Sequence, residues 1–155
     1  MNWYVRSESW IFIVRSYLPR LMLCSLVWEI AQMPLYTMRA EPRLRSFAFA
    51  VAHCTVGDAV IGTSALIMAL TLSRAGERTI WPRKRIGWLM ILLAIAYTLP
   101  SERINLADGN WAYSTWMPVV PWVDVGLAPV MQWTIVPLVT WWWANRQPFR
   151  AHGFR

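Results

Sequence analysis

The chain has 155 residues, of which 57% are hydrophobic and only 15% are charged, and its mean hydropathy is +0.34. Charged residues make up about 25% of an ordinary soluble domain, so this composition excludes that class and indicates a membrane protein, as do the twelve Trp. The net charge of +7 does not indicate nucleic-acid binding, because the basic residues lie scattered between apolar blocks and form no recognisable nucleic-acid-binding module.

The first membrane-spanning helix is predicted at residues 18–37. Residues 1–20 lead into it, and their mixture of aromatic and Arg side chains is typical of a segment at the membrane interface. A cleaved signal peptide is the alternative. Glu29 and Gln32 interrupt the apolar run, however, and no small-residue cleavage site follows, so we favour a retained span.

The second span is predicted at residues 46–72 and the third at residues 86–105. Small residues recur at a spacing of four in the second span, and this spacing lets helices approach closely in lipid. The pairs are Ala48 with Ala52, Ala59 with Thr63, and Ala65 with Ala69. The clean apolar part of the third span ends at Pro100 and falls short of the roughly 20 residues that a bilayer requires, so we extend it to residue 105.

Residues 101–118, SERINLADGNWAYSTWMP, carry aromatic side chains among charged and amide groups. A flexible linker would be rich in Gly and Ser or uniformly charged, so we predict an ordered cap loop over one end of the helices. The fourth span is predicted at residues 117–144, where Pro121, Pro129 and Pro137 favour a kink or a re-entrant start. It ends in three consecutive Trp, which are typical of an interfacial anchor.

The predicted fold is all-α: one membrane domain over residues 1–155, built as an integral membrane four-helix bundle with an ordered aromatic extracytoplasmic loop. Basic residues beside the spans predict its orientation. Eleven fall at one end, namely Arg6, Arg15, Arg20, Arg74, Arg78, Arg83, Lys84, Arg85, Arg146, Arg150 and Arg155, and four at the other, namely Arg39, Arg43, Arg45 and Arg103. Both termini are therefore predicted to be cytoplasmic.

Ionisable side chains lie inside the predicted spans, where each costs about 2.5–3.5 kcal/mol to bury without a partner. At about 1.5 Å per helical residue, one from each span lies within roughly 10 Å of the outer face; they are Glu29, His53, Glu102 and Asp124. Asp58 and Gln132 are expected deeper in the membrane. Gln32 shares a helix face with Glu29, and Asn105 shares one with Glu102 if the third helix continues that far.

Two interpretations of these polar residues remain open. In the first, they hydrogen-bond to one another and tie the helices together, with His53 held by Glu29 or Asp58. In the second, they line a water-accessible pocket that opens outward beneath the cap loop. Crowded carboxyl groups in such a pocket would leave an acid beside a base.

The functional interpretation assigns roles to particular residues. The candidate catalytic residues are Glu29, His53, Asp58 and Glu102, and the candidate substrate-binding residues are Gln32, Asn105, Trp111, Tyr113, Asp124, Gln132 and Trp133. We expect no metal and no cofactor, because a haem with two His ligands needs a second intramembrane His, and zinc would need carboxylates to complete its ligands. A nucleophile elbow and a phosphate-binding glycine loop are both absent.

Proton chemistry on a lipid-soluble substrate is the first hypothesis, because isomerising an isoprenoid or sterol-like molecule requires an acid, a base and an apolar cavity with aromatic walls. The second hypothesis is a non-enzymatic accessory or structural subunit that binds a partner helix or a pigment. The third is a small proton-coupled transporter, which would have to form oligomers because four spans are few. The expected partners are membrane lipid, a lipid-soluble small molecule, and either a second copy of the chain or a partner membrane subunit.

Five segments together resemble a family of small four-span bacterial inner-membrane proteins, described as uncharacterised. The segments are WEIAQMPLY (28–36), HCTVGD (53–58), SERIN (101–105), WAYSTWMP (111–118) and GLAPVMQW (126–133). The resemblance extends over about residues 28–143 and implies the four-span fold and a location in the bacterial inner membrane, with no activity attached. A looser likeness in chemistry and size, without a shared motif, relates the chain to helical bundles of the sterol-isomerase type.

Overall fold

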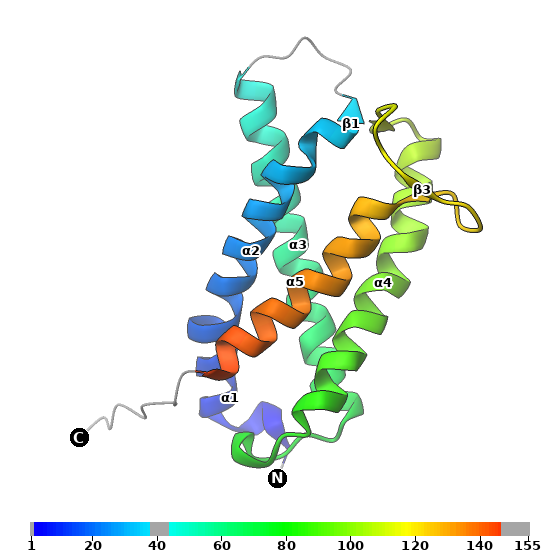
Figure 1. Cartoon of the computed structure of the whole chain (residues 1–155). Coiled ribbons are helices and arrows are strands. Elements are labelled where there is room, and N and C mark those ends of the chain that lie inside the picture. Colours follow the sequence, from blue (N-terminus) through cyan, green and yellow to red (C-terminus); the bar gives the residue numbers. More distant parts are fainter. Residues whose placement is uncertain (1, 38–43, 147–155) are drawn as a thin grey trace.

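The computed structural model describes residues 2–37 and 44–146, and it is mostly helical (78%), with four long helices (Figure 1). A short element, η1 (Trp3–Val5), begins the described chain. A continuous helical segment then runs from Ser7 to Leu35, and it consists of α1 (Ser7–Ile11), the π-helical η2 (Phe12–Tyr17), α2 (Leu18–Gln32) and η3 (Met33–Leu35). The other helical elements are α3 (Leu44–Leu72), η4 (Arg78–Ile80), α4 (Arg83–Ala107) and α5 (Leu127–Arg146).

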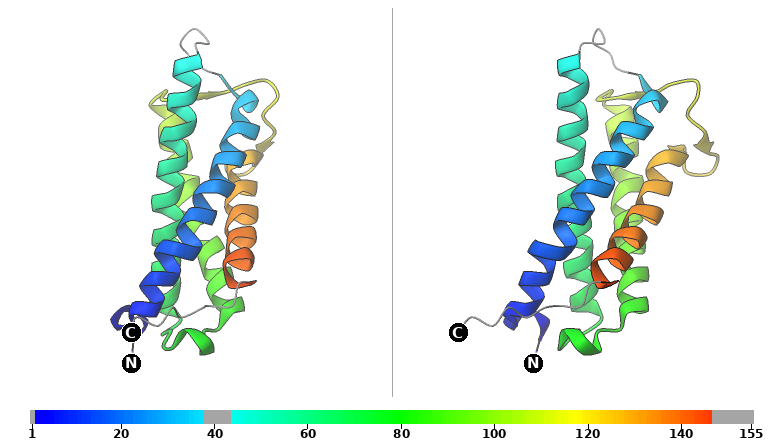
Figure 2. Two further views of the ribbon diagram at one scale, coloured as in Figure 1. Left: turned by 90° about the vertical axis from the view of Figure 1, so that its left-hand side faces the viewer. Right: turned by 60° about the vertical axis from the view of Figure 1, so that its left-hand side comes forward.

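The four long helices pack in a closed ring (Figure 2). α2 packs on α3 and α5, and α4 packs on the same two helices from the other side. The first residues of the chain, the connection around η4 and the end of α5 lie at one end of this ring (Figure 1). The connection between α4 and α5 lies toward the opposite end.

Small residues of α3 allow its close contact with α2. A Cβ atom at Gly62 would lie only 2.7 Å from Leu21 Cδ2, so the two helices touch where α3 has no side chain. The predicted small-residue stripe is buried in its later part (Ala59, Ala65 and Ala69) and exposed at its start (Ala48 and Ala52). The stripe therefore serves packing only along part of α3.

Three helical segments are long and apolar enough to cross a membrane: Ser7–Leu35, Leu44–Leu72 and Arg83–Ala107. Each also carries large apolar side chains on the outside of the ring, such as Val27, Val60 and Leu92, which are 61%, 62% and 62% exposed. Lipid solvates such an outer surface whereas water does not, so the surface fits a protein that lies in a membrane.

Several boundaries differ from the prediction. Residues 7–17, expected to form an interfacial segment, are helical and lengthen the first span to 29 residues. α4 continues through Pro100 to Ala107, so the first part of the predicted cap loop is helical. α5 begins only at Leu127 and has 20 residues, and it is not among the three segments that are both long and apolar enough to cross a membrane. The fourth span therefore stays a prediction.

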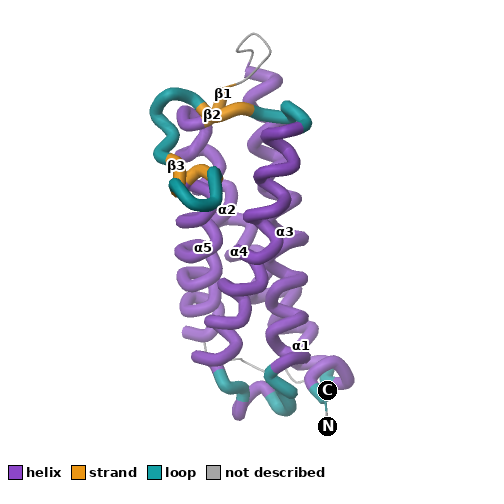
Figure 3. Tube along the Cα trace, turned by 90° about the vertical axis from the view of Figure 1, so that its right-hand side faces the viewer, coloured by secondary structure: helices purple, strands orange, loops and turns teal. Residues whose placement is uncertain are grey.

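The connection between α4 and α5 takes part in two small antiparallel ladders, one of them with the segment that follows η3 (Figure 3). β1 (Tyr36–Thr37) pairs with β2 (Ala112–Tyr113), which places Tyr36 opposite Tyr113. β3 (Val119–Val120) pairs with β4 (Val125–Gly126) in a hairpin that precedes α5. The Ser114 N–H also donates to Leu35 O at 2.9 Å, so this connection is fastened to the end of the first helix.

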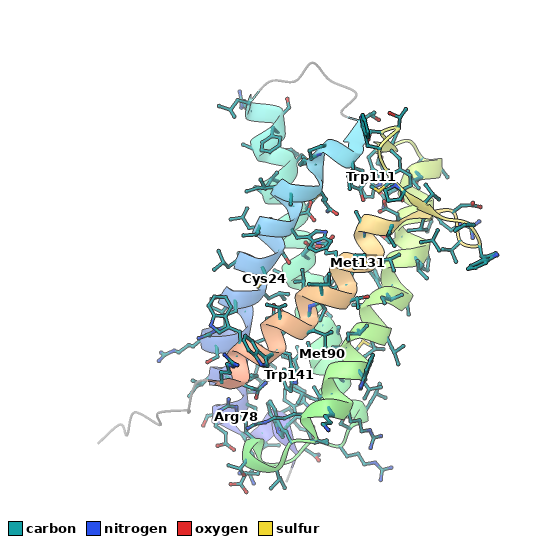
Figure 4. All side chains as sticks on the ribbon, viewed as in Figure 1. Cys24, Arg78, Met90, Trp111, Met131 and Trp141 are labelled. Atoms are coloured by element: carbon teal, nitrogen blue, oxygen red, sulfur yellow. The ribbon has the colours of Figure 1, made fainter. Side chains whose placement is uncertain are left out.

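The interior has an apolar half and a polar half. The apolar half lies toward η4 and includes Phe12, Tyr17, Leu21, Leu66, Leu70, Ile86, Met90 and Trp141. Figure 4 shows Met90 and Trp141 in this half and Trp111 near the other end. Most buried polar side chains belong to the other half, namely Ser25, Glu29, Gln32, Thr55, Asp58, Thr98, Glu102 and Gln132. The side chains with acid/base chemistry are thus gathered beneath the α4–α5 connection.

Candidate functional site

Gln132 on α5 joins two carboxyl groups that come from two other helices. Its Nε2 atom donates to Glu29 Oε1 at 3.0 Å and to Asp58 Oδ2 at 2.6 Å. Gln32 Nε2 donates to the same Glu29 oxygen at 2.7 Å and to Gln132 Oε1 at 3.3 Å. These four side chains are only 3–7% exposed, and together they link α2, α3 and α5. We call them the carboxyl network.

Helical spacing explains how α2 contributes two members to the carboxyl network. Glu29 and Gln32 are three residues apart, so they lie on one face of the helix. Trp28 Nε1 donates to Gln32 Oε1 at 3.0 Å, which leaves the amide Nε2 of Gln32 to donate into the network. Each amide therefore points its nitrogen toward a carboxyl group.

The carboxyl network contains two acidic side chains, Glu29 and Asp58, and two amides. Among residues 2–37 and 44–146, no Lys or Arg forms a salt bridge with Glu29 or Asp58. The two carboxyl groups are also close enough for a hydrogen bond between them. Two negative charges in contact within a poorly polarisable interior repel strongly, so this arrangement is suited to holding a proton between the two groups.

Glu102 on α4 receives three hydrogen bonds on a single oxygen, Oε1. The donors are Tyr113 OH at 2.8 Å, Tyr36 OH at 3.1 Å and Trp111 Nε1 at 3.2 Å. The Gly126 N–H in turn donates to Tyr113 OH at 2.8 Å. Three donors compensate a buried carboxylate for the water that it has lost. Glu102 therefore fastens the α4–α5 connection to the helices.

The two tyrosines that donate to Glu102 lie outside the apolar spans, and both are harder to ionise than a tyrosine in water. Burial raises the pKa of Tyr36, and the negative charge of Glu102 and, more weakly, of Glu29 raises it further. Burial likewise raises the pKa of Tyr113. The hydrogen bond from the Gly126 N–H lowers this pKa in part, whereas the nearby Glu102 raises it further. Because Tyr36 responds to both Glu102 and Glu29, the two polar clusters are electrostatic neighbours.

His53 and Asp124 lie outside both clusters. His53 is exposed on α3, where its ring stacks on Phe49 with centroids 5.7 Å apart. Asp58 is five residues further along the same helix, a turn of about 140° around the axis, so the two side chains face different directions. Asp124 is exposed in the β3–β4 turn with φ of 51°, and the prediction that it lies within a membrane span is therefore wrong.

Asn105 and Trp133 have partners outside the two polar clusters. Asn105 Nδ2 donates to Ser101 O at 2.8 Å and its Oδ1 accepts from Asn110 Nδ2 at 2.8 Å, so this amide closes the end of α4. Trp133 is buried and packs against small residues of α3 and α4. Of the predicted substrate-binding residues, the structure thus places Gln32 and Gln132 on the carboxyl network, and Trp111 and Tyr113 on Glu102.

Two residues of this site were not predicted from the sequence, Tyr36 and Gly126. Tyr36 reaches Glu102 because β1 pairs with β2, and ladders of two residues leave no periodicity in a sequence. Gly126 is required where the hairpin is tightest: a Cβ atom there would lie 2.8 Å from Met117 Sδ. The only available signal was the glycine itself, placed just before the apolar run of α5.

In comparisons with known proteins, no family model, curated protein or solved structure matches the chain. The resemblance to four-span bacterial membrane proteins accordingly stays a prediction. Function is argued below from the two polar clusters alone.

Two further features of the described chain concern metal ligands and open space. Within the described part of the chain, no three His, Cys, Asp or Glu side chains are grouped so that they could hold a metal ion. An open groove of about 410 Å³ lies between α4 and α5, lined by residues such as Gly87 and Trp141 at the end near η4. It is distant from the carboxyl network, so the groove and the network are separate features.

Proposed function

We propose that the chain is a membrane-embedded four-helix bundle in which Glu29 and Asp58 perform acid/base chemistry on a lipid-soluble molecule. The observation that carries the proposal is the single Gln132 amide that donates to both buried carboxyl groups. One proton shared by the pair makes one group an acid and the other a base. The proposal thus uses two of the four candidate catalytic residues, Glu29 and Asp58, and assigns no proton transfer to His53.

The reaction that fits an acid beside a base is the movement of a carbon–carbon double bond in an isoprenoid or sterol-like molecule. The protonated carboxyl group donates its proton to one alkene carbon and leaves a carbocation. The other carboxylate removes a proton from a neighbouring carbon, so the double bond shifts and the pair again holds one proton. Glu102, held by three donors, fastens the α4–α5 connection to the helices.

The proposal includes an orientation. The end that carries η4 and the end of α5 would face the cytoplasm, because the sequence places most of its Lys and Arg there. The α4–α5 connection and both polar clusters would then lie toward the outer face. A bacterial inner membrane is proposed on the resemblance of the sequence segments alone.

Hydrogen exchange between solvent and lipid tests the proposed chemistry. The protein, in lipid nanodiscs with mixed isoprenoid lipids, is incubated in D₂O, and mass spectrometry follows deuterium bound to carbon. The wild type should introduce deuterium, since the donated proton comes from solvent. Glu29→Gln removes the acid at nearly constant shape and should lower the rate by roughly 10²–10⁴-fold. Asp124→Asn changes an exposed acid outside the network and should leave the rate unchanged.

An accessory subunit is the second candidate, because the amides and carboxyl groups of the carboxyl network are all hydrogen-bonded, as a purely structural tie requires. If the network is only such a structural tie, Glu29→Gln should lower the unfolding temperature, and the wild type should have no isomerase activity for this variant to reduce. If the wild type introduces no deuterium into any isoprenoid fraction, the acid/base proposal is overturned and the accessory function is favoured.

A further inference from the structure

We propose that the groove between α4 and α5 binds one anionic phospholipid, with the phosphate among Arg83, Lys84 and Arg146 and an acyl chain along the aromatic wall. This site lies at the opposite end of the helices from the carboxyl network. It requires that the chain lie in a membrane, but it does not depend on the acid/base chemistry proposed above.

The shape of the groove fits a lipid tail. Its volume is about 410 Å³, and Gly87 is one of its lining residues, where a Cβ atom would lie 3.5 Å from Trp141 Cδ1. Trp141 lies beside Gly87 and donates from Nε1 to Arg83 O at 3.1 Å, which fixes α5 against the start of α4. Trp141 is shown near the η4 end in Figure 4. Trp88 and Leu138 line the groove as well, and both are exposed to whatever occupies it.

The charge of the groove fits a phosphate group. Arg83 and Lys84 are the first residues of α4, and Arg146 is the last residue of α5, so three cations meet at one end of an otherwise largely aromatic lining. The Arg146 guanidinium lies over the Trp142 ring at 3.5 Å, which holds it at the rim. The positive end of the α4 dipole points the same way, and Pro82 before it provides no side-chain cap.

The position of the groove selects an anionic lipid over a zwitterionic one. It lies at the end of the bundle that the basic residues assign to the cytoplasm, where the membrane leaflet carries anionic headgroups. Each Lys or Arg near such a surface strengthens the attraction, and basic pockets between membrane helices are suited to phosphate headgroups. A zwitterionic headgroup would place its own cation close to the same three side chains.

Native mass spectrometry of the full chain in detergent tests this site. Phosphatidylglycerol should give an adduct of one lipid, and phosphatidylcholine should bind at least roughly tenfold more weakly. The variant Arg83→Gln/Lys84→Gln/Arg146→Gln should lose the preference for phosphatidylglycerol. Gly87→Leu keeps every charge but fills the groove, and it should also lose the adduct.

A charge-matched variant separates the groove from general attraction to basic surface. Its substitutions are Arg15→Gln, Arg74→Gln and Arg85→Gln, which remove three exposed cations outside the groove lining. It should bind phosphatidylglycerol like the wild type. Equal losses in the two triple variants would overturn the proposal, as would equal binding of the two lipids. Displacement of the lipid by millimolar inorganic phosphate would instead assign the site to free phosphate and overturn it too.

Discussion

Tyr36 and Tyr113 both donate a hydrogen bond to Glu102, but they differ in their other hydrogen bonds. Tyr113 OH also accepts from the Gly126 N–H, whereas within residues 2–37 and 44–146 Tyr36 OH forms only its hydrogen bond to Glu102. Tyr113→Phe leaves two groups without their partner and should lower the free energy of unfolding by about 2–3 kcal/mol, against about 1 kcal/mol for Tyr36→Phe. Thermal unfolding in detergent measures both, with Tyr97→Phe on the exposed face of α4 as the control.

Alkaline pH provides a second measurement on the same variants. The pKa values of both tyrosines are raised in the folded protein, while the unfolded chain ionises near the ordinary value of about 10. Above that pH the folded state binds more protons than the unfolded state, so the free energy of unfolding falls as pH rises. Each Tyr→Phe variant should show a smaller fall than the wild type. An unchanged fall would contradict the raised pKa values of the two tyrosines.

His53 and Asp58 show what could be predicted at single positions. Counting residues from the membrane face gives the depth of a side chain but not its direction. The direction follows from the buried positions of α3, which include Val51, Thr55, Asp58 and Gly62 at helical spacing. Asp58 lies on this stripe and His53 does not. The small residues do not trace this stripe along the whole of α3, because Ala48 and Ala52 are exposed, so their spacing could not predict the direction of His53.

Among the helices, α2 and α3 make the closest approach, at Gly62. Gly62→Ala would place a Cβ atom 2.7 Å from Leu21 Cδ2, so the two helices must separate or Leu21 must leave its buried position. We expect a loss of about 1–3 kcal/mol in the free energy of unfolding. Gly57 on the same helix has no atom within 4 Å of the corresponding position, so Gly57→Ala should be neutral or slightly stabilising.

Thermal or denaturant unfolding in detergent distinguishes these two glycines. A combined Gly62→Ala/Leu21→Ala variant provides a further control, because it removes the clash but also a buried side chain. If Gly62→Ala and Gly57→Ala behave alike, the close approach of α2 and α3 does not exist in the folded protein.

The start of α5 shows why one element was predicted with the wrong boundaries. Residues 117–126 contain enough apolar side chains to continue the pattern of a span, yet they form the β3–β4 hairpin. Pro118 and Pro121 lack the N–H that a continuing helix needs, and Asp124 turns the chain with a positive φ. The two prolines and Asp124 could have been recognised in the sequence as helix-breaking residues. The pairing of β1 with β2 could not, because it joins segments about 75 residues apart and has no local sequence signal.

At the scale of the whole molecule, the predicted orientation in the membrane places the α4–α5 connection outside the cell and η4 in the cytoplasm. Asn110 is exposed in the α4–α5 connection, and Glu77 is exposed near η4 at the other end. In a chain whose two native cysteines, Cys24 and Cys54, are replaced by Ser, Asn110→Cys should react with a membrane-impermeant thiol reagent on intact cells. Glu77→Cys should react only after permeabilisation. The opposite pattern would reverse the orientation without changing the fold.

The helical character and the separation of polar from apolar regions could be predicted from hydropathy, and the three apolar segments of the structure overlap the first three predicted spans. The carboxyl network could be predicted only in part. Glu29 and Gln32 share a face by spacing alone, but the meeting of Gln132 with Asp58 depends on how α3 and α5 pack. No distance along the sequence encodes that packing.

The carboxyl network also constrains the order in which the chain can mature. Gln132 follows Asp58 by 74 residues and Glu29 by 103, so a ribosome has exported both acids well before their common amide is synthesised. During that interval Glu29 and Asp58 lack the hydrogen bonds that Gln132 Nε2 donates to them in the folded protein. We therefore expect the helices to complete their packing only after α5 has been synthesised. A protein truncated before α5 should be degraded by membrane proteases faster than the full chain.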